Sequence, residues 1–347
     1  MPYRIIGSPD PKYLAATDIL VGDMSDTNYE FLLYNRPIIL LANDWMRKNF
    51  PGIGIRTDLN GLKSAIKRSM AHPEEFEKKR EYYLAKAIEK PDGRASERII
   101  KIVLEKSGIS HPIFYFLDGG DQVLRSNLSP LEEEVKKRGY ECHRMARLKE
   151  SDDKNNIFIS AHFENLHIKG SGFRVHFDHG LKGQGTANVE MSRRDYEKNQ
   201  FFPYIDLHIT AGEMGHERTT QILLGPNAGR AFMAGYPKAD HLMNLNTKEN
   251  KNAVMKEFGF DISKPLITYA PSGKKSYEKP GGSFSPEALD EFTRIARTEN
   301  LNILIKLKSY TPSLKIHAFF APYPIPKPSH IMKAVHFINM VRKFMKF

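Results

Sequence analysis

The sequence predicts an α/β fold built from Rossmann-like units with parallel sheets. Short apolar runs of strand length alternate with segments of helical periodicity as far as residue 309. Strands that alternate with helices pair in parallel, and helices then cover both faces of their sheet. The chain has 347 residues, which at roughly 150 residues per domain allows about two such units.

The first segment begins with a strand, a turn, a helix and a second strand. An apolar run at 18–22 leads into a polar turn at 23–27, then into a helix through residue 34 and a second apolar run at 37–41. Three further helices are predicted, at 59–70, from 72 onward with Pro73 in the first turn, and at 95–106.

Two more segments repeat the alternation of strands and helices. After Gly108, strands are predicted for five apolar runs, at 113–117, 157–160, 173–177, 205–210 and 231–234. A helix is predicted at 130–138. The third segment supplies a strand at 266–270, a loop rich in Gly and Lys, a helix that opens at 285–287 and a strand at 301–307.

Basic residues are concentrated near the C-terminus. The chain carries 52 Lys+Arg against 41 Asp+Glu, and eight of the basic residues but no acidic residue follow Glu299. Removing those eight leaves 44 against 41, so the body of the protein is close to neutral. The tail is therefore the segment expected to seek an anionic partner.

Residues 311–347 are predicted to form a proline-rich spacer and a basic amphipathic helix. Prolines alternate from 322 to 328, which favours an extended segment, and Ser329 is a suitable helix cap. An apolar half of this helix opposes a face of Lys and Arg, which is typical of binding to an anionic membrane surface. Packing against the protein is the alternative. Nucleic-acid binding is not expected, because the tail lacks the motifs of a recognition fold.

The composition excludes several classes of protein. With 40% hydrophobic and 27% charged residues, the chain is neither disordered nor collagen-like. We expect a soluble, cytoplasmic protein, because no run reaches the roughly 18 apolar residues of a membrane span and the start lacks a secretory signal. Cys142 is the single cysteine, which allows no internal disulfide and agrees with a reducing compartment.

No metal or other cofactor is predicted, although the chain has 13 histidines. His176 and His179 are three residues apart at a predicted strand and would point to opposite faces. The segment 213–217 does not supply a His-Glu-x-x-His helix. The other histidines are weaker candidates for metal ligands, namely His143, His162, His167, His176, His208 and His216.

The turn at 23–27 is a candidate phosphate site. It lies where a buried strand gives way to a helix, and its residues include Asp23, Ser25, Asp26 and Thr27. Backbone N–H groups at the helix start, together with the hydroxyls of Ser25 and Thr27, would favour an anionic phosphate. An ordinary helix cap is the alternative interpretation of the same residues.

The stretch that contains this turn resembles a known family. The runs D-I-L-V-G-D-M-S-D at 18–26, Y-E-F-L-L at 29–33 and R-P-I-I at 36–39 are similar to stretches of the CDP-glycerol:poly(glycerophosphate) glycerophosphotransferases, the teichoic-acid polymerase family. The corresponding family stretches read D-L-I-T-D-Y-S-S, F-D-F and K-P-I-I. Further similar stretches are D-G-R-A-S at 92–96, G-Y-P-K-A-D at 235–240 and Y-A-P-S at 269–272, so the resemblance covers most of residues 10–308.

The resemblance implies a fold and an activity. The fold is GT-B, in which two Rossmann-like domains face each other across a cleft. The activity is transfer of glycerol phosphate from CDP-glycerol to a growing polymer with release of CMP. The resemblance also implies that Asp23, Ser25 and Asp26 lie at the donor diphosphate and that Glu30 reaches the nucleotide ribose. Asp26 stands where the family has its second serine.

A second constellation lies at 177–185, where a strand runs into the glycine-rich stretch F-D-H-G-L-K-G-Q-G. It resembles the family's W-H-G-T-P-L-K-K, with Asp178 in place of tryptophan. The resemblance implies that His179 is the general base, and that Gly180 and Lys182 belong to a loop that holds phosphate. Apart from the resemblance, a lone histidine at the end of a strand is more often structural.

Two further loops supply candidate binding residues. Lys306 and Lys308 lie where the family has K-x-H-P, and Lys308 replaces the histidine with a positive charge. The loop S-G-K-K-S that begins at Ser272 is either a solvated charged loop or a phosphate-facing one.

The order of the similar blocks differs from that of the family, because the D-M-S-D block comes last there and first here. Residues 1–107 then correspond to the second half of the nucleotide-binding domain, 108–236 to the acceptor-side domain and 237–310 to the first half of the nucleotide-binding domain. The chain is either circularly permuted or an out-of-phase piece of a tandem protein. A permuted chain places the strand at 301–307 in the same parallel sheet as the strand at 19–21.

The resemblance implies a transferase of cell-wall teichoic-acid biosynthesis. It would move glycerol phosphate, or a related polyol phosphate, from a CDP-polyol donor to a lipid-linked polyol-phosphate acceptor at the cytoplasmic face of the membrane. The alternative is a catalytically silent, nucleotide-sugar-binding or membrane-docked scaffold. The changed positions Asp26, Asp178 and Lys308 favour that alternative.

Overall fold

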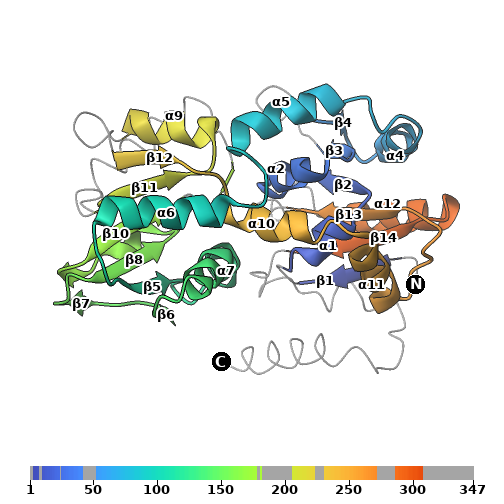
Figure 1. Cartoon of the computed structure of the whole chain (residues 1–347). Coiled ribbons are helices and arrows are strands. Elements are labelled where there is room, and N and C mark those ends of the chain that lie inside the picture. Colours follow the sequence, from blue (N-terminus) through green and yellow to red (C-terminus); the bar gives the residue numbers. More distant parts are fainter. Residues whose placement is uncertain are drawn as a thin grey trace.

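The computed structural model describes residues 3–7, 10–23, 25–41, 52–177, 180–181, 205–222, 230–271 and 286–307. These residues form two six-stranded sheets with helices packed around them, and every pair of neighbouring strands in both sheets is parallel. Figure 1 shows the two sheets at opposite ends of the molecule, with helix α10 between them. The structure confirms the α/β prediction and is consistent with a GT-B-like fold.

The first sheet combines strands from both ends of the described chain. Its order is β1-β14-β13-β2-β3-β4. The strands are β1 (Tyr3–Ile6), β2 (Ile19–Gly22), β3 (Ile38–Leu41), β4 (Ile55–Thr57), β13 (Leu266–Ala270) and β14 (Asn302–Lys306). Because β13 pairs with both β14 and β2, the strand predicted at 301–307 does lie in one parallel sheet with the strand at 19–21.

The second sheet is built from the middle of the chain, in the order β12-β11-β10-β8-β5-β6. Its strands are β5 (Ile113–Leu117), β6 (Cys142–Met145), β8 (Asn156–Ser160), β10 (Phe173–Phe177), β11 (Leu207–Thr210) and β12 (Ala231–Met233). A separate two-stranded pair joins β7 (Glu150–Ser151) to β9 (Lys169–Gly170).

The helices follow the strands in the alternation expected from the sequence. They are α1 (Lys12–Ala16), α2 (Thr27–Phe31), α4 (Leu62–Ala71), α5 (Glu77–Ala87), α6 (Ala95–Ser107), α7 (Gln122–Lys137), α9 (Glu213–Ile222), α10 (Pro237–Asn244), α11 (Lys248–Phe258) and α12 (Pro286–Thr298). Two 3-10 turns, η1 (Leu32–Tyr34) and η2 (Phe163–Leu166), complete the described elements.

Two helix boundaries differ from the prediction. Helix α5 begins at Glu77 rather than at Pro73, because the Pro73 carbonyl accepts a hydrogen bond of 2.8 Å from the buried Arg80 side chain. Helix α7 begins at Gln122, well before the predicted start, and continues through Pro130. Its buried face packs into the core of the second sheet, and this packing outweighs the helix-breaking tendency of proline.

Each sheet has its own apolar core. In the first, Val21, Ile39 and Ile303 pack against Phe292 of α12. In the second, the strands pack against Ile99, Ile100 and Val103 of α6 and against the buried leucines of α7. Burial of such side chains contributes about 1.5–3 kcal/mol each, so both sheets have a substantial hydrophobic core.

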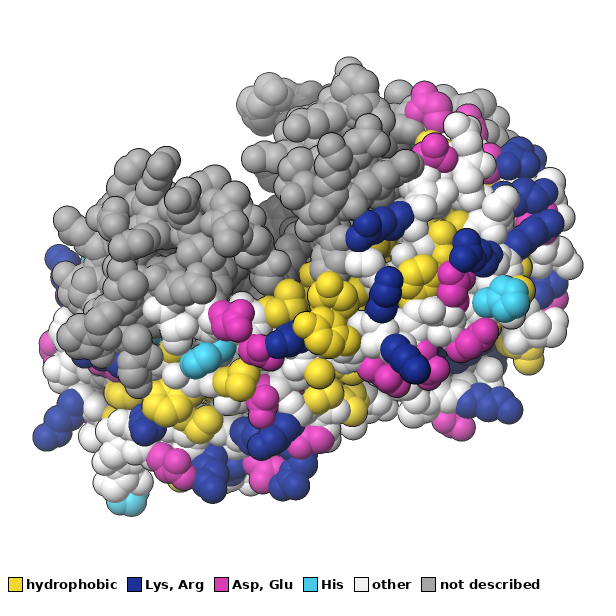
Figure 2. Space-filling model, turned by 90° about the horizontal axis from the view of Figure 1, so that it is seen from above, with side chains coloured by type: hydrophobic (Ala, Val, Ile, Leu, Met, Phe, Trp, Pro, Cys, Tyr) yellow, Lys and Arg dark blue, Asp and Glu magenta, His cyan; other side chains and the backbone are white. Residues whose placement is uncertain are grey.

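Charges of both signs mix on the described surface. Figure 2 shows one face of the molecule on which Lys and Arg side chains lie beside Asp and Glu side chains. Among the described residues, ion pairs join Lys63 and Lys67 to the carboxylate of Glu299. This agrees with the near-neutral body expected from the sequence. Within the described residues, no helix combines the length and the apolar character needed to cross a bilayer.

Several predicted features lie outside the described residues. These are the site residues His179, Lys182, Ser272 and Lys308, and the tail at 311–347.

Candidate functional site

The strand order identifies a ligand position in the first sheet. If the count starts at β13, continues to β14 and then to β1–β4, the order of the sheet reads 3-2-1-4-5-6. In open parallel sheets of this order, ligands bind beyond the carboxyl ends of the strands at the point where the order reverses. That point lies between β13 and β2. The turn that begins at Asp23 directly follows β2, and Ala270 ends β13.

The turn after β2 is held by a buried amide. The Asn28 side chain is fully buried, and its Nδ2 donates a hydrogen bond to the Asp23 carbonyl. Gly22 lies against the same amide, where a Cβ atom would collide with Asn28 Oδ1. Asp23 itself is buried at 3% exposure. These contacts fix the start of the turn, so Asp23 faces the protein and is not a mobile surface carboxylate.

The hydroxyls and amides of the turn bond to one another. Ser25 Oγ donates to Thr27 Oγ1 over 3.1 Å, and the Thr27 amide donates back to Ser25 Oγ over 3.3 Å. The amides of Asn28, Tyr29 and Glu30 donate to carbonyls of the same turn. The structure therefore gives these three amides internal partners, whereas the sequence suggested that amides at the helix start would face phosphate. The Ser25 hydroxyl would have to exchange its acceptor to donate to a ligand, whereas the Thr27 hydroxyl only accepts in this bond.

The second constellation lies against the first. A Cβ atom placed on Gly180 would lie 2.8 Å from Asp26 Oδ2. Leu181 is buried, and it belongs to a core cluster that also contains Tyr29, Tyr236 and Ala270. Gly180 follows β10 of the second sheet, and Asp26 follows β2 of the first. The structure thus brings together two sequence blocks that are more than 150 positions apart, both at the carboxyl ends of strands.

Glu30 lies one helical turn beyond Asp26 in a buried polar cluster. Its carboxylate forms an ion pair with Lys238 Nζ at 2.7 and 2.9 Å. The Tyr236 hydroxyl lies 3.1 Å from Glu30 Oε1 and 3.0 Å from Asn127 Oδ1. Burial, and then the negative charge of Glu30, raise the pKa of the Tyr236 hydroxyl well above its ordinary value. The cluster joins α2 and the start of α10 to α7, which packs on the second sheet.

The cluster around Glu30 was only partly visible in the sequence. Glu30 was expected to reach a ribose, and the structure places its carboxylate on Lys238 and Tyr236. Tyr236 and Lys238 belong to the G-Y-P-K-A-D stretch, which carried the resemblance without an assigned role. Nothing in the sequence pointed to Asn127, whose partner Tyr236 is 109 positions away.

Lys306 is the described candidate at the other side of the switch point. It ends β14, next to β13, and is half-buried. Its register partner is Ile6 of the edge strand β1. Its strand therefore ends at the same edge of the sheet as the Asp23 turn. The described residues contain no group of three or more His, Cys, Asp or Glu side chains that could hold a metal ion.

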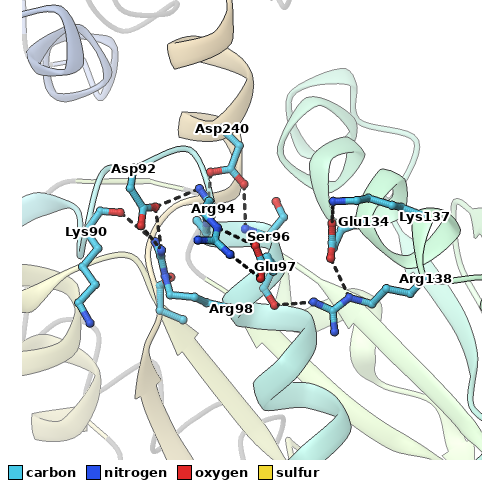
Figure 3. Close-up of polar contacts among 12 residues, drawn as sticks. Lys90, Asp92, Arg94, Ser96, Glu97, Arg98, Glu134, Lys137, Arg138 and Asp240 are labelled. Carbon is cyan, nitrogen blue, oxygen red and sulfur yellow. Dashed lines mark hydrogen bonds and ion pairs between the residues drawn. The ribbon is translucent and has the colours of Figure 1, made fainter.

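The remaining blocks of the resemblance meet away from this turn. Asp240, the last residue of G-Y-P-K-A-D, accepts hydrogen bonds from the backbone amides of Ala95 (3.0 Å) and Ser96 (2.8 Å). It therefore caps helix α6 at the end of the D-G-R-A-S stretch, as Figure 3 shows. A carboxylate is favourable at a helix N-terminus, because the free amides and the helix dipole attract negative charge.

Comparison with known proteins supports the resemblance to the glycerophosphotransferase family. Residues 11–105 match the family model described as CDP-Glycerol:Poly(glycerophosphate) glycerophosphotransferase. The matched segment includes the turn at 23–27, Glu30 and the capped start of α6. No curated protein and no solved structure gives a significant match. Over residues 11–105, the chain is therefore similar to the CDP-glycerol:poly(glycerophosphate) glycerophosphotransferase family.

Proposed function

We propose that the protein is a glycerophosphotransferase that uses a CDP-activated donor, either CDP-glycerol or a similar CDP-polyol. It transfers the polyol phosphate to a lipid-linked polyol-phosphate acceptor and releases CMP. The observation that carries the proposal is the contact between Asp26 and Gly180 at the switch point of the first sheet. This contact joins the block matched by the family to the block that contains His179.

In the proposed reaction, His179 takes the proton of the acceptor hydroxyl. The hydroxyl oxygen then attacks the donor phosphorus that carries the polyol, and the bond from this phosphorus to the CMP oxygen breaks in line with the attack. CMP leaves with the bonding electron pair. His179 directly precedes Gly180 in the chain, and Gly180 lies against Asp26.

The proposed donor position needs positive charge. Asp23 and Asp26 are acidic, and a diphosphate is anionic, so cations must offset their repulsion. Glu30 already has Lys238 as its cation. Lys306, at the carboxyl end of β14, is the described candidate for this role. Lys182, Ser272 and Lys308 are proposed to contribute from the neighbouring loops, and Ser25 and Thr27 to contribute hydroxyls.

The residues of the first sheet are proposed to form the nucleotide-binding domain, with residues 1–107 and 237–310 as its two halves, although α6 at the end of the first half packs on the second sheet. Residues 108–236 are then the acceptor-side domain. Both assignments follow the resemblance and the shared sheet of β2 and β14. The amphipathic tail at 329–347 is proposed to dock this protein on anionic lipid at the cytoplasmic face of the membrane, where a lipid-linked acceptor is available.

The test is release of CMP from CDP-glycerol in the presence of a lipid-linked acceptor. Replacing His179 with alanine should lower the rate at least about a hundredfold, because the variant lacks the general base. His143→Ala is the matched control, since His143 is a half-exposed residue on the far edge strand β6 and pairs with Glu141. Unchanged turnover of the His179 variant would exclude this mechanism.

A second candidate is a silent scaffold that binds the nucleotide but does not transfer. The position of Asp26 favours it, because a carboxylate lies against Gly180 where the family has a serine. Calorimetry separates the two candidates. A scaffold binds CDP-glycerol without CMP release, whereas an enzyme does both.

A further inference from the structure

The chain passes between the two sheets twice, and the two crossings lie side by side. The first crossing runs from the end of α5 to the start of α6, and the second from β12 to α10. The Glu89 amide donates to the Ala211 carbonyl over 2.7 Å. In the second crossing, Gly235 lies so close to the first that an added Cβ would be 2.9 Å from the Glu89 carbonyl oxygen.

A single side chain, that of Arg98, bonds to both crossings. Its Nε donates to the Ala234 carbonyl of the second crossing over 3.1 Å. Its Nη2 donates to the carbonyls of Glu89 (3.4 Å) and Lys90 (2.8 Å) in the first crossing. Arg98 is on the first turns of α6, which packs on the second sheet. The guanidinium therefore ties both connections to the same helix.

The remaining donors of Arg98 bind a carboxylate of the first crossing. Nη1 donates to both oxygens of Asp92, over 2.7 and 2.8 Å (Figure 3). Each nitrogen of the guanidinium thus has at least one acceptor. This hydrogen bond is the main cause that lowers the pKa of Asp92, which keeps the carboxylate charged.

The first crossing has a conformation that needs support. Lys90 has a φ of +43°, in the left-handed region that residues other than glycine rarely adopt. Such a conformation costs of order 1 kcal/mol and persists only where its surroundings hold it. The carbonyl of Lys90 accepts hydrogen bonds from both Arg98 and the Asp92 amide. Asp240 also joins the two crossings, because it belongs to α10 and its side chain caps α6.

We infer that Arg98 is a brace that sets the relative orientation of the two sheets. It fixes the two crossings to each other and to α6, and thereby sets how closely the Gly180 loop approaches the Asp26 turn. A lysine at position 98 keeps the charge but cannot bond to four groups in a planar array, because its donors share one nitrogen. The inference concerns the placement of the sheets, so it does not depend on the proposed function.

The test measures a distance between the two units without any ligand. Nitroxide labels are placed on Lys154→Cys, beside the second sheet, and Ile262→Cys, beside the first. Both positions are exposed, and Cys142→Ala removes the native thiol. Pulsed electron resonance then gives the distribution of label distances. In the parent we expect one narrow distribution, and with Arg98→Lys a distribution widened at least about twofold, because the crossings can rotate.

Arg94→Lys is the matched control. Arg94 lies four residues away on the same segment, is 66% exposed and pairs only locally with Glu97, so the same chemical change should leave the distribution unchanged. A folded Arg98→Lys protein with the parent distribution would overturn the inference. If that variant does not fold, Asp92→Asn weakens one side of the brace and keeps its carbonyl contacts. A parent-like distance distribution in the Asp92→Asn variant would also overturn the inference, and a widened distribution would support it.

Discussion

Glu30 and Lys238 form a buried ion pair with Nζ to oxygen distances of 2.7 and 2.9 Å, although 208 positions separate them in the chain. Their side chains are only 8% and 13% exposed. The pair lies one helical turn from Asp26 and shares the Tyr236 hydroxyl with Asn127 of α7. A polar cluster therefore joins the proposed donor turn to the second unit, directly behind the contact between Asp26 and Gly180.

Replacing Lys238 with methionine should destabilise the protein by about 3 kcal/mol, because it leaves the buried Glu30 carboxylate without its cation. Urea denaturation of both proteins measures the change. Lys264→Met is the control, since its ion pair with Asp261 is far more exposed and its loss should cost about 0.5 kcal/mol. The double variant Glu30→Gln with Lys238→Met should recover part of the loss. If Glu30 instead serves a ribose, Glu30→Gln would weaken donor binding and leave stability unchanged.

Gly180→Ala should weaken CDP-glycerol binding, because the new methyl group would come within 2.8 Å of Asp26 Oδ2 and must displace the carboxylate or the loop. We expect a loss of roughly tenfold, about 1.4 kcal/mol, by calorimetry. Asp26→Ala removes the carboxylate that the new methyl group would meet, so the double variant should recover part of the affinity. Gly52→Ala is the control, since its methyl group would make only ordinary contacts of 3.6 Å or more. Equal affinity of Gly180→Ala and the parent would contradict the proposed closeness of the two loops to the donor.

The strands of the core could be predicted because most of their side chains are buried. The bounds of β5, β10 and β13 are those expected from their apolar runs. The edge strands β1 and β4 are only half-buried and carry mixed side chains, so they left no apolar run to recognise. Local periodicity reports burial, and it fails where burial is partial.

The candidate site was predictable block by block but not as an arrangement. Each block stood out by its residues, yet the contact of Asp26 with Gly180 depends on how two sheets pack. The role of Asp240 illustrates the same limit. Its partners are backbone amides 144 and 145 positions earlier. Every residue except proline has such an amide, so the sequence does not indicate these partners. Helix boundaries failed where a tertiary contact, such as that of Arg80 with Pro73, competed with local signals.

His208 should make the protein less stable in mild acid. Burial, and then the positive charge of Arg230, lower the pKa of its imidazole from 6.5 to about 3, and its ring packs edge-on against His176. Between pH 6.5 and about 3 the unfolded chain binds a proton at this position and the folded protein does not. The free energy of unfolding therefore falls as the pH falls through this window, by at most about 1.4 kcal/mol per pH unit.

Urea denaturation at pH 7, 6 and 5 measures this slope. His208→Gln cannot titrate, so its stability should depend less steeply on pH than that of the parent. His72→Gln is the control for the same chemical change at an exposed surface position. A His208→Gln protein with the parent's slope would show that other groups cause the acid sensitivity.

Gly235→Ala should destabilise the protein through both its backbone conformation and a steric clash. Gly235 has a φ of +98°, which an L-amino acid rarely adopts, and its added methyl group would lie 2.9 Å from the Glu89 carbonyl oxygen and 3.0 Å from Ala95 Cβ. Gly259→Ala separates these two effects, since Gly259 has a φ of +65° but open space around it. The Gly259 variant should lose about 1 kcal/mol through backbone conformation alone. The Gly235 variant should lose at least about 3 kcal/mol, because the two crossings must also move apart. Thermal and urea denaturation compare the two variants. Equal losses of stability would contradict a steric clash between the crossings.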